Sequence, residues 1–226
     1  MPSASTASTM FLGLEPDARL SERICTYKRR VHALVGPQTF LDHPPHLTLY
    51  LAAFANGAAV ADAVALVVRE LHAVRTSILG WHTFWSDQLT GRHTLVCQLD
   101  DLAVEELREI QHYAIAALAP LRHAKVTATR YASRLAGLSP AEQASIASSG
   151  FPFTGEHWHP HLTIASVNAV DWPTIERELL PNPPKLDGCF PALALYRLVD
   201  EHPIMLRRFP LANVDAASNR KLRLAS

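Results

Sequence analysis

Hydrophobic residues recur at helical spacing in several stretches of the chain. After Asp17 they fall at every third or fourth position as far as Leu34, which predicts an amphipathic helix that Gly36-Pro37 ends. The same spacing predicts further helices within residues 57–71, 101–121 and 172–180, and a capping box with Pro140 at the first helical position and Gly150 as the stop predicts a short helix over residues 140–149. Capping residues precede the last three of these helices: Asp100 or Asp101, Ser139 in a capping box, and Asp171.

Shorter apolar runs that contain β-branched or aromatic residues predict strands. They cover residues 11–14, 46–51, 78–87, 93–99, 161–167, 193–199 and 204–211. Single helices separate these strands and two pairs of strands read as hairpins, so we predict an α+β fold rather than a doubly wound sheet. The order of elements is roughly repeated, which predicts two lobes with a boundary between residues 53 and 125, unless the lobes exchange elements.

One short sequence occurs twice, each time at the start of a predicted strand. Pro45-His46-Leu47-Thr48-Leu49 and Pro160-His161-Leu162-Thr163-Ile164 differ only at the last residue, and they lie about half the chain apart. Side chains alternate between the two faces of a strand, so the His and the Thr of each copy point the same way while the Leu points into the core. The sequence therefore predicts two matched His-Thr pairs.

Two imidazoles and two hydroxyls in one cleft make an acid–base site. The usual histidine pKa of about 6.5 lets one of His46 and His161 accept a proton while the other donates one. The hydroxyls of Thr48 and Thr163 can donate hydrogen bonds to two oxygens of a phosphate group. Cleavage of a phosphodiester needs these functions, because one proton leaves the nucleophile and another reaches the leaving oxygen. Neither a metal ion nor a cofactor is required.

The paired motifs resemble those of the 2H phosphoesterase superfamily, which includes 2'-5' RNA ligase-like proteins and RNA 2',3'-cyclic phosphodiesterases. The resemblance implies a two-lobed α+β fold, each lobe an antiparallel-rich sheet with helices, around a central cleft with pseudo-twofold symmetry. It also implies that His46 and His161 are catalytic and that Thr48 and Thr163 bind phosphate. The implied substrate is a 2',3'-cyclic phosphate of a nucleotide or RNA end, or another small phosphodiester. Many RNA cyclic phosphodiesterases of this family carry a basic residue after the second motif, where this chain has Ala165-Ser166-Val167.

Three alternatives to this interpretation remain open. The alternate histidines of His157-Trp158-His159-Pro160-His161 can present imidazoles on one face, as in a metal-dependent hydrolase. Pro160 interrupts that strand and no Cys or carboxylate cluster has metal-ligand spacing, so we expect no metal. A second alternative is a module that binds a nucleotide or RNA end without turnover. The third is that both histidines are core residues, which the matched pair disfavours.

Five side chains outside the motifs are candidate substrate contacts: Tyr50, Arg130, Tyr131, Arg134 and Tyr196. The first follows the His and Thr of its strand at alternate spacing, and an aromatic ring there can stack on a nucleobase. The next three lie within residues 125–155, the least regular part of the chain, which reads as a lid or specificity loop. The last lies in the final hairpin, at the expected edge of the cleft. For each, a structural or solvent-exposed position is the alternative.

Composition limits the class of ligand. The 226 residues are 48% hydrophobic, and 21 Lys and Arg balance 21 Asp and Glu. A chain of this size can bury a full core, and the zero net charge does not favour a long polyanion held by a basic surface. A small phosphate ester or a short RNA end fits better. Lys28-Arg29-Arg30 is predicted to be a solvated face of the first helix, and a phosphate-binding patch is the alternative.

We expect one two-lobed domain over residues 10–212, between a disordered tail of residues 1–9 and a flexible tail of residues 213–226. Three widely spaced cysteines without a CxxC pair predict reduced thiols, as in a cytoplasmic protein. The N-terminal residues lack the features of a signal peptide, and no apolar run is long enough to span a membrane. We therefore expect a cytoplasmic monomer that does not contact membranes.

Overall fold

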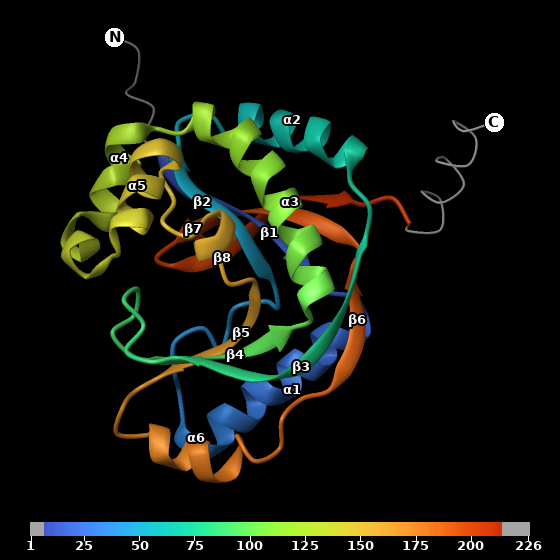
Figure 1. Cartoon of the computed structure of the whole chain (residues 1–226), viewed down its shortest axis with the longest axis vertical. Coiled ribbons are helices and arrows are strands. Elements are labelled where there is room, and N and C mark those ends of the chain that lie inside the picture. Colours follow the sequence, from blue (N-terminus) through green and yellow to red (C-terminus); the bar gives the residue numbers. More distant parts are fainter. Residues whose placement is uncertain (1–6, 214–226) are drawn as a thin grey trace.

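Eight strands form within residues 7–213, the part of the chain that this computed structural model describes. They are β1 (Ser8–Glu15), β2 (Leu47–Phe54), β3 (Val74–Phe84), β4 (His93–Leu99), β5 (His161–Val167), β6 (Leu186–Phe190), β7 (Ala192–Val199) and β8 (His202–Pro210). The strands make two antiparallel sheets, in the orders β2-β1-β7-β8 and β5-β4-β3-β6 (Figure 1). The predicted α+β fold with two antiparallel lobes is confirmed.

Six α-helices lie between these strands in the same residues: α1 (Ala18–Val35), α2 (Gly57–Val67), α3 (Asp101–Leu118), α4 (Ala124–Tyr131), α5 (Pro140–Ser149) and α6 (Trp172–Glu178). Asp17 and Asp100 cap α1 and α3, because their carboxylates accept hydrogen bonds from first-turn amides at 2.8 and 3.0 Å. Ser139 and Glu142 form the predicted capping box of α5, and Gly150 ends that helix in the left-handed conformation, with φ of 85°.

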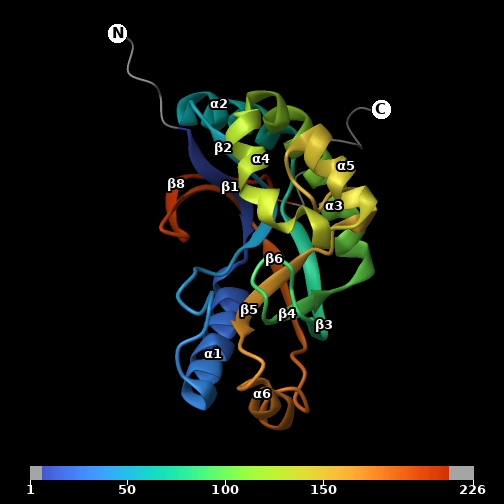
Figure 2. The same ribbon diagram turned by 90° about the vertical axis from the view of Figure 1, so that its left-hand side faces the viewer.

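Helices α1 and α3 link the two halves of the fold (Figure 2). Helix α1 follows β1 in sequence yet contacts β5 and β6 of the other sheet, together with α6. Helix α3 contacts both β2 and β3, one strand of each sheet. Helices α1 and α6 lie at one end of the molecule, and α2, α4 and α5 lie at the opposite end (Figures 1 and 2).

The two halves of the sequence exchange strands between the sheets. The last strands, β7 and β8, join β1 and β2, whereas β3 and β4 pair with β5 and β6. No single boundary between residues 53 and 125 therefore separates the lobes, in line with the alternative that the lobes exchange elements. Each motif strand, β2 and β5, ends up at the edge of its sheet, and these two edge strands contact each other. The exchange thus brings the two motifs together.

Both motif strands contain a β-bulge at the same place in the motif. In β2, Thr48 pairs with Gly13 and Tyr50 with Leu12, which leaves Leu49 as the extra residue. In β5, Thr163 pairs with Val96 and Ala165 with Leu95, which leaves Ile164 as the extra residue. A bulge shifts the alternation of side chains beyond it. The face shared by the His and the Thr of each motif is therefore not continued by the second residue after the Thr.

Several sequence-based boundaries need correction. Residues 125–155 are mostly helical, because α4, a 3-10 helix (Ala132–Gly137) and α5 occupy most of them. The chain also forms β6, which no periodicity indicated, since its short sequence contains Asp187 and Gly188. Strand β1 begins at Ser8, so the last two residues of the predicted N-terminal tail are in a strand. Residues 1–6 and 214–226, which make up the rest of both predicted tails apart from Ala7 and Asn213, lie outside the described residues.

One hydrophobic core extends through both lobes. It contains the buried stripes of α1 and α3 and the inward side chains of the strands, including Leu47, Leu49, Leu162 and Ile164, each with 0% exposure. Burial of such a side chain contributes about 1.5–3 kcal/mol each. The apolar residues of both motifs thus hold the two strands in place. In the described part of the chain, no helix is both long enough and apolar enough to cross a membrane.

Candidate active site

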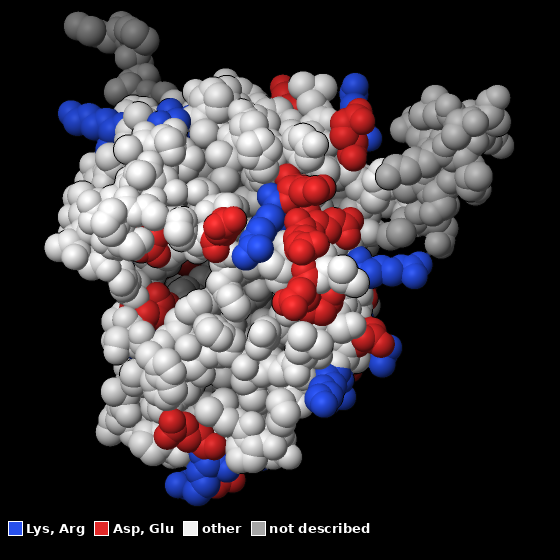
Figure 3. Space-filling model, viewed as in Figure 1, with Lys and Arg blue, Asp and Glu red and all other residues white. Residues whose placement is uncertain are grey.

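The two motifs line one cavity of about 610 Å³ between the lobes. His46 and Thr48 face it from β2 and the turn before it, and His161 and Thr163 face it from β5. The space-filling view shows the surface hollowed below α4 and α5, while many charged side chains of this face gather over α3 (Figure 3). The fold therefore brings both His-Thr pairs into one cleft, as expected from the sequence.

The two histidines make the same backbone hydrogen bond. Nδ1 of His46 lies 2.7 Å from the carbonyl oxygen of Pro44, and Nδ1 of His161 lies 2.6 Å from that of His159. A carbonyl oxygen only accepts, so each Nδ1 carries the hydrogen. Within residues 7–213, neither Nε2 has a hydrogen-bond partner. Each neutral ring therefore keeps a free lone pair on Nε2 for proton transfer.

A phenylalanine from another strand of the same sheet packs on each of these rings. The centroid of the Phe11 ring on β1 lies 4.8 Å from that of His46, and the Phe84 ring at the end of β3 lies 5.0 Å from that of His161. Both phenylalanines also line the cavity. Packing on one side and a backbone hydrogen bond on another fix the orientation of each imidazole, which preorganises the pair.

Burial lowers the pKa of both imidazoles. The pKa of His46 falls to about 4, chiefly through desolvation, and the nearby positive charges of His43 and Lys28 lower it further. The pKa of His161 is also lowered by desolvation, against the hydrogen bond to His159 and the negative charge of Asp87, which raise it. A second imidazole acts on each ring, His43 on His46 and His82 on His161, and the rings differ in that Lys28 acts on His46 whereas the Asp87 carboxylate acts on His161.

The threonine hydroxyls are free to bind a ligand. Thr48 and Thr163 are half-buried at the cavity wall. Among the residues that the structure describes, neither hydroxyl makes a hydrogen bond. By contrast, the neighbouring Thr94 hydroxyl is held by Asp87 at 2.6 Å and by Ser166. Two unpaired hydroxyl donors beside two imidazoles suit a tetrahedral anion with several acceptor oxygens.

Three of the five candidate contacts outside the motifs line the cavity: Arg130, Tyr131 and Arg134. The guanidinium of Arg130 forms an ion pair with the Glu201 carboxylate at 2.9 Å. Glu201 belongs to the turn between β7 and β8, and it also lines the cavity. The ring of Tyr131 is buried, and burial raises the pKa of its hydroxyl. These side chains lie in and just after α4, at the upper wall of the cavity.

Tyr50 and Tyr196 do not line the cavity, contrary to expectation. The bulge at Leu49 turns Tyr50 into the core, where it is 0% exposed and its hydroxyl donates to the carbonyl oxygen of Ser149. Leu51 takes the place at the cavity wall instead. Tyr196 is buried behind Phe11, with ring centroids 4.7 Å apart. It therefore supports the ring that packs on His46.

Sequence reasoning misplaced Lys28, and it did not single out Phe11 or Phe84 as site residues. Lys28 was assigned to a solvated face with Arg29 and Arg30, but it is only 5% exposed and lines the cavity, whereas the two arginines are exposed. Its spacing held the signal, because Lys28 lies four residues after Ile24 and three before Val31, on the buried stripe of α1. A charged residue at a core position of a helix indicates a specific role for that charge.

Within residues 7–213, no group of three or more His, Cys, Asp or Glu side chains is arranged to hold a metal ion. The alternate histidines before the second motif point to different partners. The His159 ring stacks on His82 with centroids 4.5 Å apart, and His157 is exposed at the cavity edge. Burial, together with the neighbouring His82 imidazole, lowers the pKa of His159 to about 4.

Comparison with known proteins bears on the family. A family model described as the 2'-5' RNA ligase superfamily matches residues 16–199. The fold is similar to TT0787 of Thermus thermophilus, at 17% identity and a TM-score of 0.57, over 91% of this chain and 99% of that one. It is also similar to Escherichia coli LigT in apo form, at 13% identity and a TM-score of 0.51, over 91% and 98% of the two chains.

A further structure of E. coli LigT, complexed with 3'-AMP, matches at 15% identity and a TM-score of 0.51, over 91% of this chain and 98% of that chain. At such identities the likeness shows a shared fold. Comparison with curated protein sequences gives no match.

Proposed function

This chain belongs to the 2'-5' RNA ligase superfamily, and from that premise we propose that it is a metal-independent phosphodiesterase that opens the 2',3'-cyclic phosphate of a nucleotide or RNA end. The resemblance to the 2H phosphoesterases drawn from the two motifs is thereby confirmed. Family membership supports a phosphoesterase-type enzyme. The particular substrate is our proposal.

The observation that carries the proposal is the equivalence of the two histidines. Each donates from Nδ1 to the carbonyl oxygen two residues earlier, each packs on a phenylalanine, and each is followed by an unpaired threonine hydroxyl in the same cavity. The exposed His202 makes the same Nδ1 contact to Asp200, so that hydrogen bond alone does not mark a catalytic ring. A catalytic role is favoured because both motifs combine it with an open Nε2 and an unpaired threonine hydroxyl in one cavity.

In the proposed reaction, Nε2 of one imidazole takes a proton from water as the water oxygen attacks phosphorus. The bond from phosphorus to the 2' or 3' ribose oxygen breaks, and that oxygen receives a proton from Nε2 of the other, protonated imidazole. His46 and His161 fill these two roles. The hydroxyls of Thr48 and Thr163 donate to the non-bridging oxygens, where negative charge increases in the transition state. The product is a ribose 2'- or 3'-phosphomonoester.

The ligand's own charge prepares the acid. With the cavity empty, burial keeps both imidazoles neutral at neutral pH. A bound phosphodiester brings a negative charge next to both rings and raises their pKa, so one of them takes up a proton when the substrate binds. The state with one neutral and one charged imidazole is therefore formed with the substrate in place.

The test is hydrolysis of the four nucleoside 2',3'-cyclic monophosphates in excess EDTA, with the phosphomonoester product identified by chromatography. We expect turnover by the wild-type protein and loss of most of the rate in His46→Ala and His161→Ala. His157→Ala is the matched control, since this exposed histidine also lines the cavity but lies outside the motifs. Activity that EDTA abolishes and a divalent ion restores would contradict the proposal. Ligand binding without any turnover would instead indicate a binding module.

A further inference from the structure

Lys28 is a buried cation without a carboxylate partner. Its side chain is 5% exposed, and its ammonium donates one hydrogen bond, to the carbonyl oxygen of Phe40. An ammonium has three N–H donors. Within residues 7–213, Lys28 forms no ion pair and no second hydrogen bond. Asp42, the carboxylate whose charge acts on Lys28, is instead paired with His202 at 2.8 Å.

Burial of an unpaired charge is costly unless something compensates for it. Burial lowers the pKa of Lys28 to about 8, so the ammonium remains mostly charged at neutral pH. The exposed neighbours Arg29 and Arg30 show that α1 offers solvated positions for basic residues. A lysine at the buried position, with donors to spare, therefore suits an anion that arrives with a ligand.

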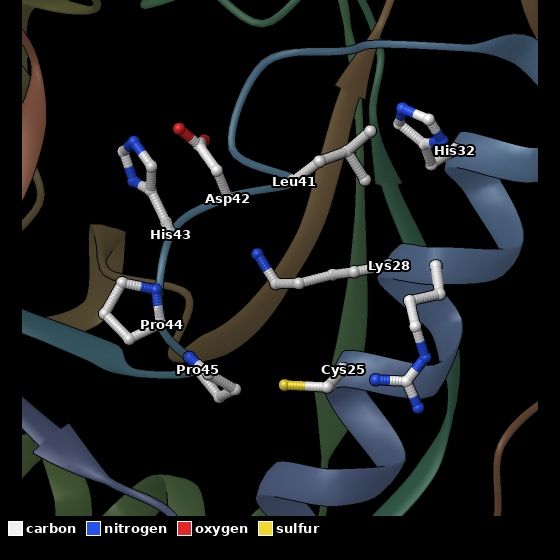
Figure 4. A pocket seen from close by; sticks show the side chains of 9 residues that line it. Cys25, Lys28, His32, Leu41, Asp42, His43, Pro44 and Pro45 are labelled. Carbon is white, nitrogen blue, oxygen red and sulfur yellow. The ribbon is translucent and has the colours of Figure 1, made fainter.

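Lys28 lies where the cavity of the histidines meets a second, smaller cavity of about 420 Å³. Four residues of α1, namely Cys25, Lys28, Arg29 and His32, form one wall of the smaller cavity, and the loop of residues 41–45 forms the other. Figure 4 shows the Lys28 amine extending from α1 toward this loop. Lys28, His43 and Pro44 line both cavities, so the smaller one continues the active-site cleft past His46.

The two cavities differ in what they offer an anion. The larger holds the paired imidazoles and hydroxyls that suit the reacting phosphate. The smaller has basic side chains along α1, while Asp42, its carboxylate, is engaged by His202. Lys28 lines the larger cavity together with His43 and His46, and its positive charge lowers the pKa of both rings.

We propose that Lys28 and the smaller cavity form a second anion subsite, which binds a phosphate group of the substrate other than the reacting one. This inference rests on the proposed function and refines its substrate class. A nucleotide with one phosphate leaves the subsite empty. A nucleotide that carries a second phosphate fills it, as does the 3'-terminal nucleotide of an RNA strand, whose 5' phosphate links it to the rest of the strand. The ammonium of Lys28 then donates its remaining N–H groups to the second phosphate.

The test compares the affinity of adenosine 3',5'-bisphosphate with that of adenosine 3'-monophosphate, by isothermal titration calorimetry at pH 7. For the wild-type protein we expect the second phosphate to tighten binding about tenfold or more, as for a hydrogen bond between charged groups. In Lys28→Met, which keeps the unbranched side chain up to the position of Cε and removes the ammonium, we expect this gain to shrink below about threefold. Affinity for the monophosphate is expected to fall as well, because Lys28 also lines the cavity of the histidines, so the deciding quantity is the ratio of the two affinities.

Arg30→Met is the matched control, because Arg30 lies on the same helix, is exposed and lines neither cavity. It should keep the full preference for the bisphosphate. If the wild-type protein binds both ligands equally, or if Lys28→Met weakens both to the same extent, the subsite does not exist as proposed. Should Lys28→Met fail to fold, Lys28→Gln replaces it, and the wild-type comparison still decides.

Failure of the subsite and failure of the proposed enzyme give different results. His161→Ala should lose turnover of cyclic phosphates and yet keep the preference for the bisphosphate, because His161 does not line the smaller cavity. If the wild-type protein binds the bisphosphate preferentially but turns over no cyclic phosphate, the result supports the subsite and contradicts the proposed phosphodiesterase activity.

Discussion

His161 donates a hydrogen bond from Nδ1 to the backbone carbonyl oxygen of His159, 2.6 Å away. The first motif repeats this contact between His46 and Pro44 at 2.7 Å. Both contacts span two residues, so the backbone before each motif strand sets the tautomer of the histidine that follows it. The carbonyl oxygen can only accept, and the reactive lone pair is therefore on Nε2 in both rings.

This geometry predicts one tautomer for both rings. In a two-bond ¹H–¹⁵N correlation spectrum at neutral pH, His46 and His161 should show the pattern of a neutral ring protonated at Nδ1. The signals of each ring are assigned from the spectra of His46→Ala and His161→Ala, because each variant lacks the signals of the histidine that it replaces. The exposed His157, with no ring hydrogen bond in the described structure, is the internal comparison. An Nε2-protonated pattern for either motif histidine would contradict the geometry.

The lowered pKa values predict an acidic optimum for kcat/KM. The base must be neutral, so activity rises with pH through its pKa, and the acid must be charged, so activity falls through the other pKa. In the free protein the pKa of His46 is about 4 and that of His161 lies below its usual 6.5. The bell for kcat/KM should therefore peak below about pH 6.5, whichever ring is the acid.

The profile of kcat reports the complex with substrate and should be displaced. Because the bound phosphate raises both pKa values, the bell for kcat should peak at higher pH than that for kcat/KM. Both profiles come from one set of initial rates at saturating and limiting substrate between pH 4 and 9. Coincident profiles, or a kcat/KM that still rises at pH 8, would show that burial does not control these groups.

The unpaired hydroxyls predict a loss on substitution by valine. Thr48→Val and Thr163→Val should each lower kcat/KM by about ten- to a hundredfold, since each removes a hydrogen bond to a charged group. The serine variants should retain most of the activity, because serine keeps the hydroxyl. Thr83→Val is the control, as Thr83 lines the same cavity outside the motifs. If the valine variants are as active as the wild-type protein, the threonine hydroxyls do not bind the phosphate.

The ion pair between Arg130 and Glu201 predicts a gain in affinity. The Glu201 carboxylate holds the Arg130 guanidinium at 2.9 Å, and its side chain is 73% exposed. Glu201→Gln removes a negative charge at the cavity wall and frees the arginine, so KM should fall by about two- to fivefold. Glu178→Gln, in a surface pair with Arg177, is the control. An unchanged or higher KM in Glu201→Gln would show that Arg130 does not meet the substrate.

The buried position of Tyr50 predicts an effect on stability rather than on catalysis. Its hydroxyl donates to the carbonyl oxygen of Ser149, and burial raises its pKa to about 12. Tyr50→Phe should lower the free energy of unfolding by about 1–2 kcal/mol, because that carbonyl loses its donor. Chemical denaturation measures this, while kcat should stay at the wild-type value. A large loss of kcat without loss of stability would contradict the buried position of Tyr50 and indicate that its side chain contacts the substrate.

The fate of Tyr50 shows where sequence reasoning reached its limit. The alternation of a strand correctly placed His46 and Thr48 on one face, because both precede the bulge. The bulge at Leu49 depends on pairing with β1, a tertiary contact that the local sequence does not encode. The prediction for Lys28 was wrong for a different reason. Its spacing on α1 indicated a buried position, but its charge led to the prediction that it is exposed to solvent.

The strand exchange between lobes marks a second limit. Hydrophobic patterns predicted α1, α3 and both hairpins, and the capping box predicted α5, because each of these elements is stabilised by local contacts and caps. It could not reveal that β7 and β8 return to the sheet of β1, since pairing partners far apart in sequence leave no periodic signal. The two motifs were nevertheless recognisable, because the same pentapeptide performs the same local task twice.

The most direct test of the paired-histidine account is a double-mutant cycle on kcat for a nucleoside 2',3'-cyclic monophosphate in EDTA. His46→Ala and His161→Ala should each lower kcat by about a hundred- to ten-thousandfold. Residues that act as one unit show non-additive losses, so the double variant should be little slower than the slower single variant. Losses that multiply in the double variant, or a single variant that keeps most of the wild-type rate, would contradict the account.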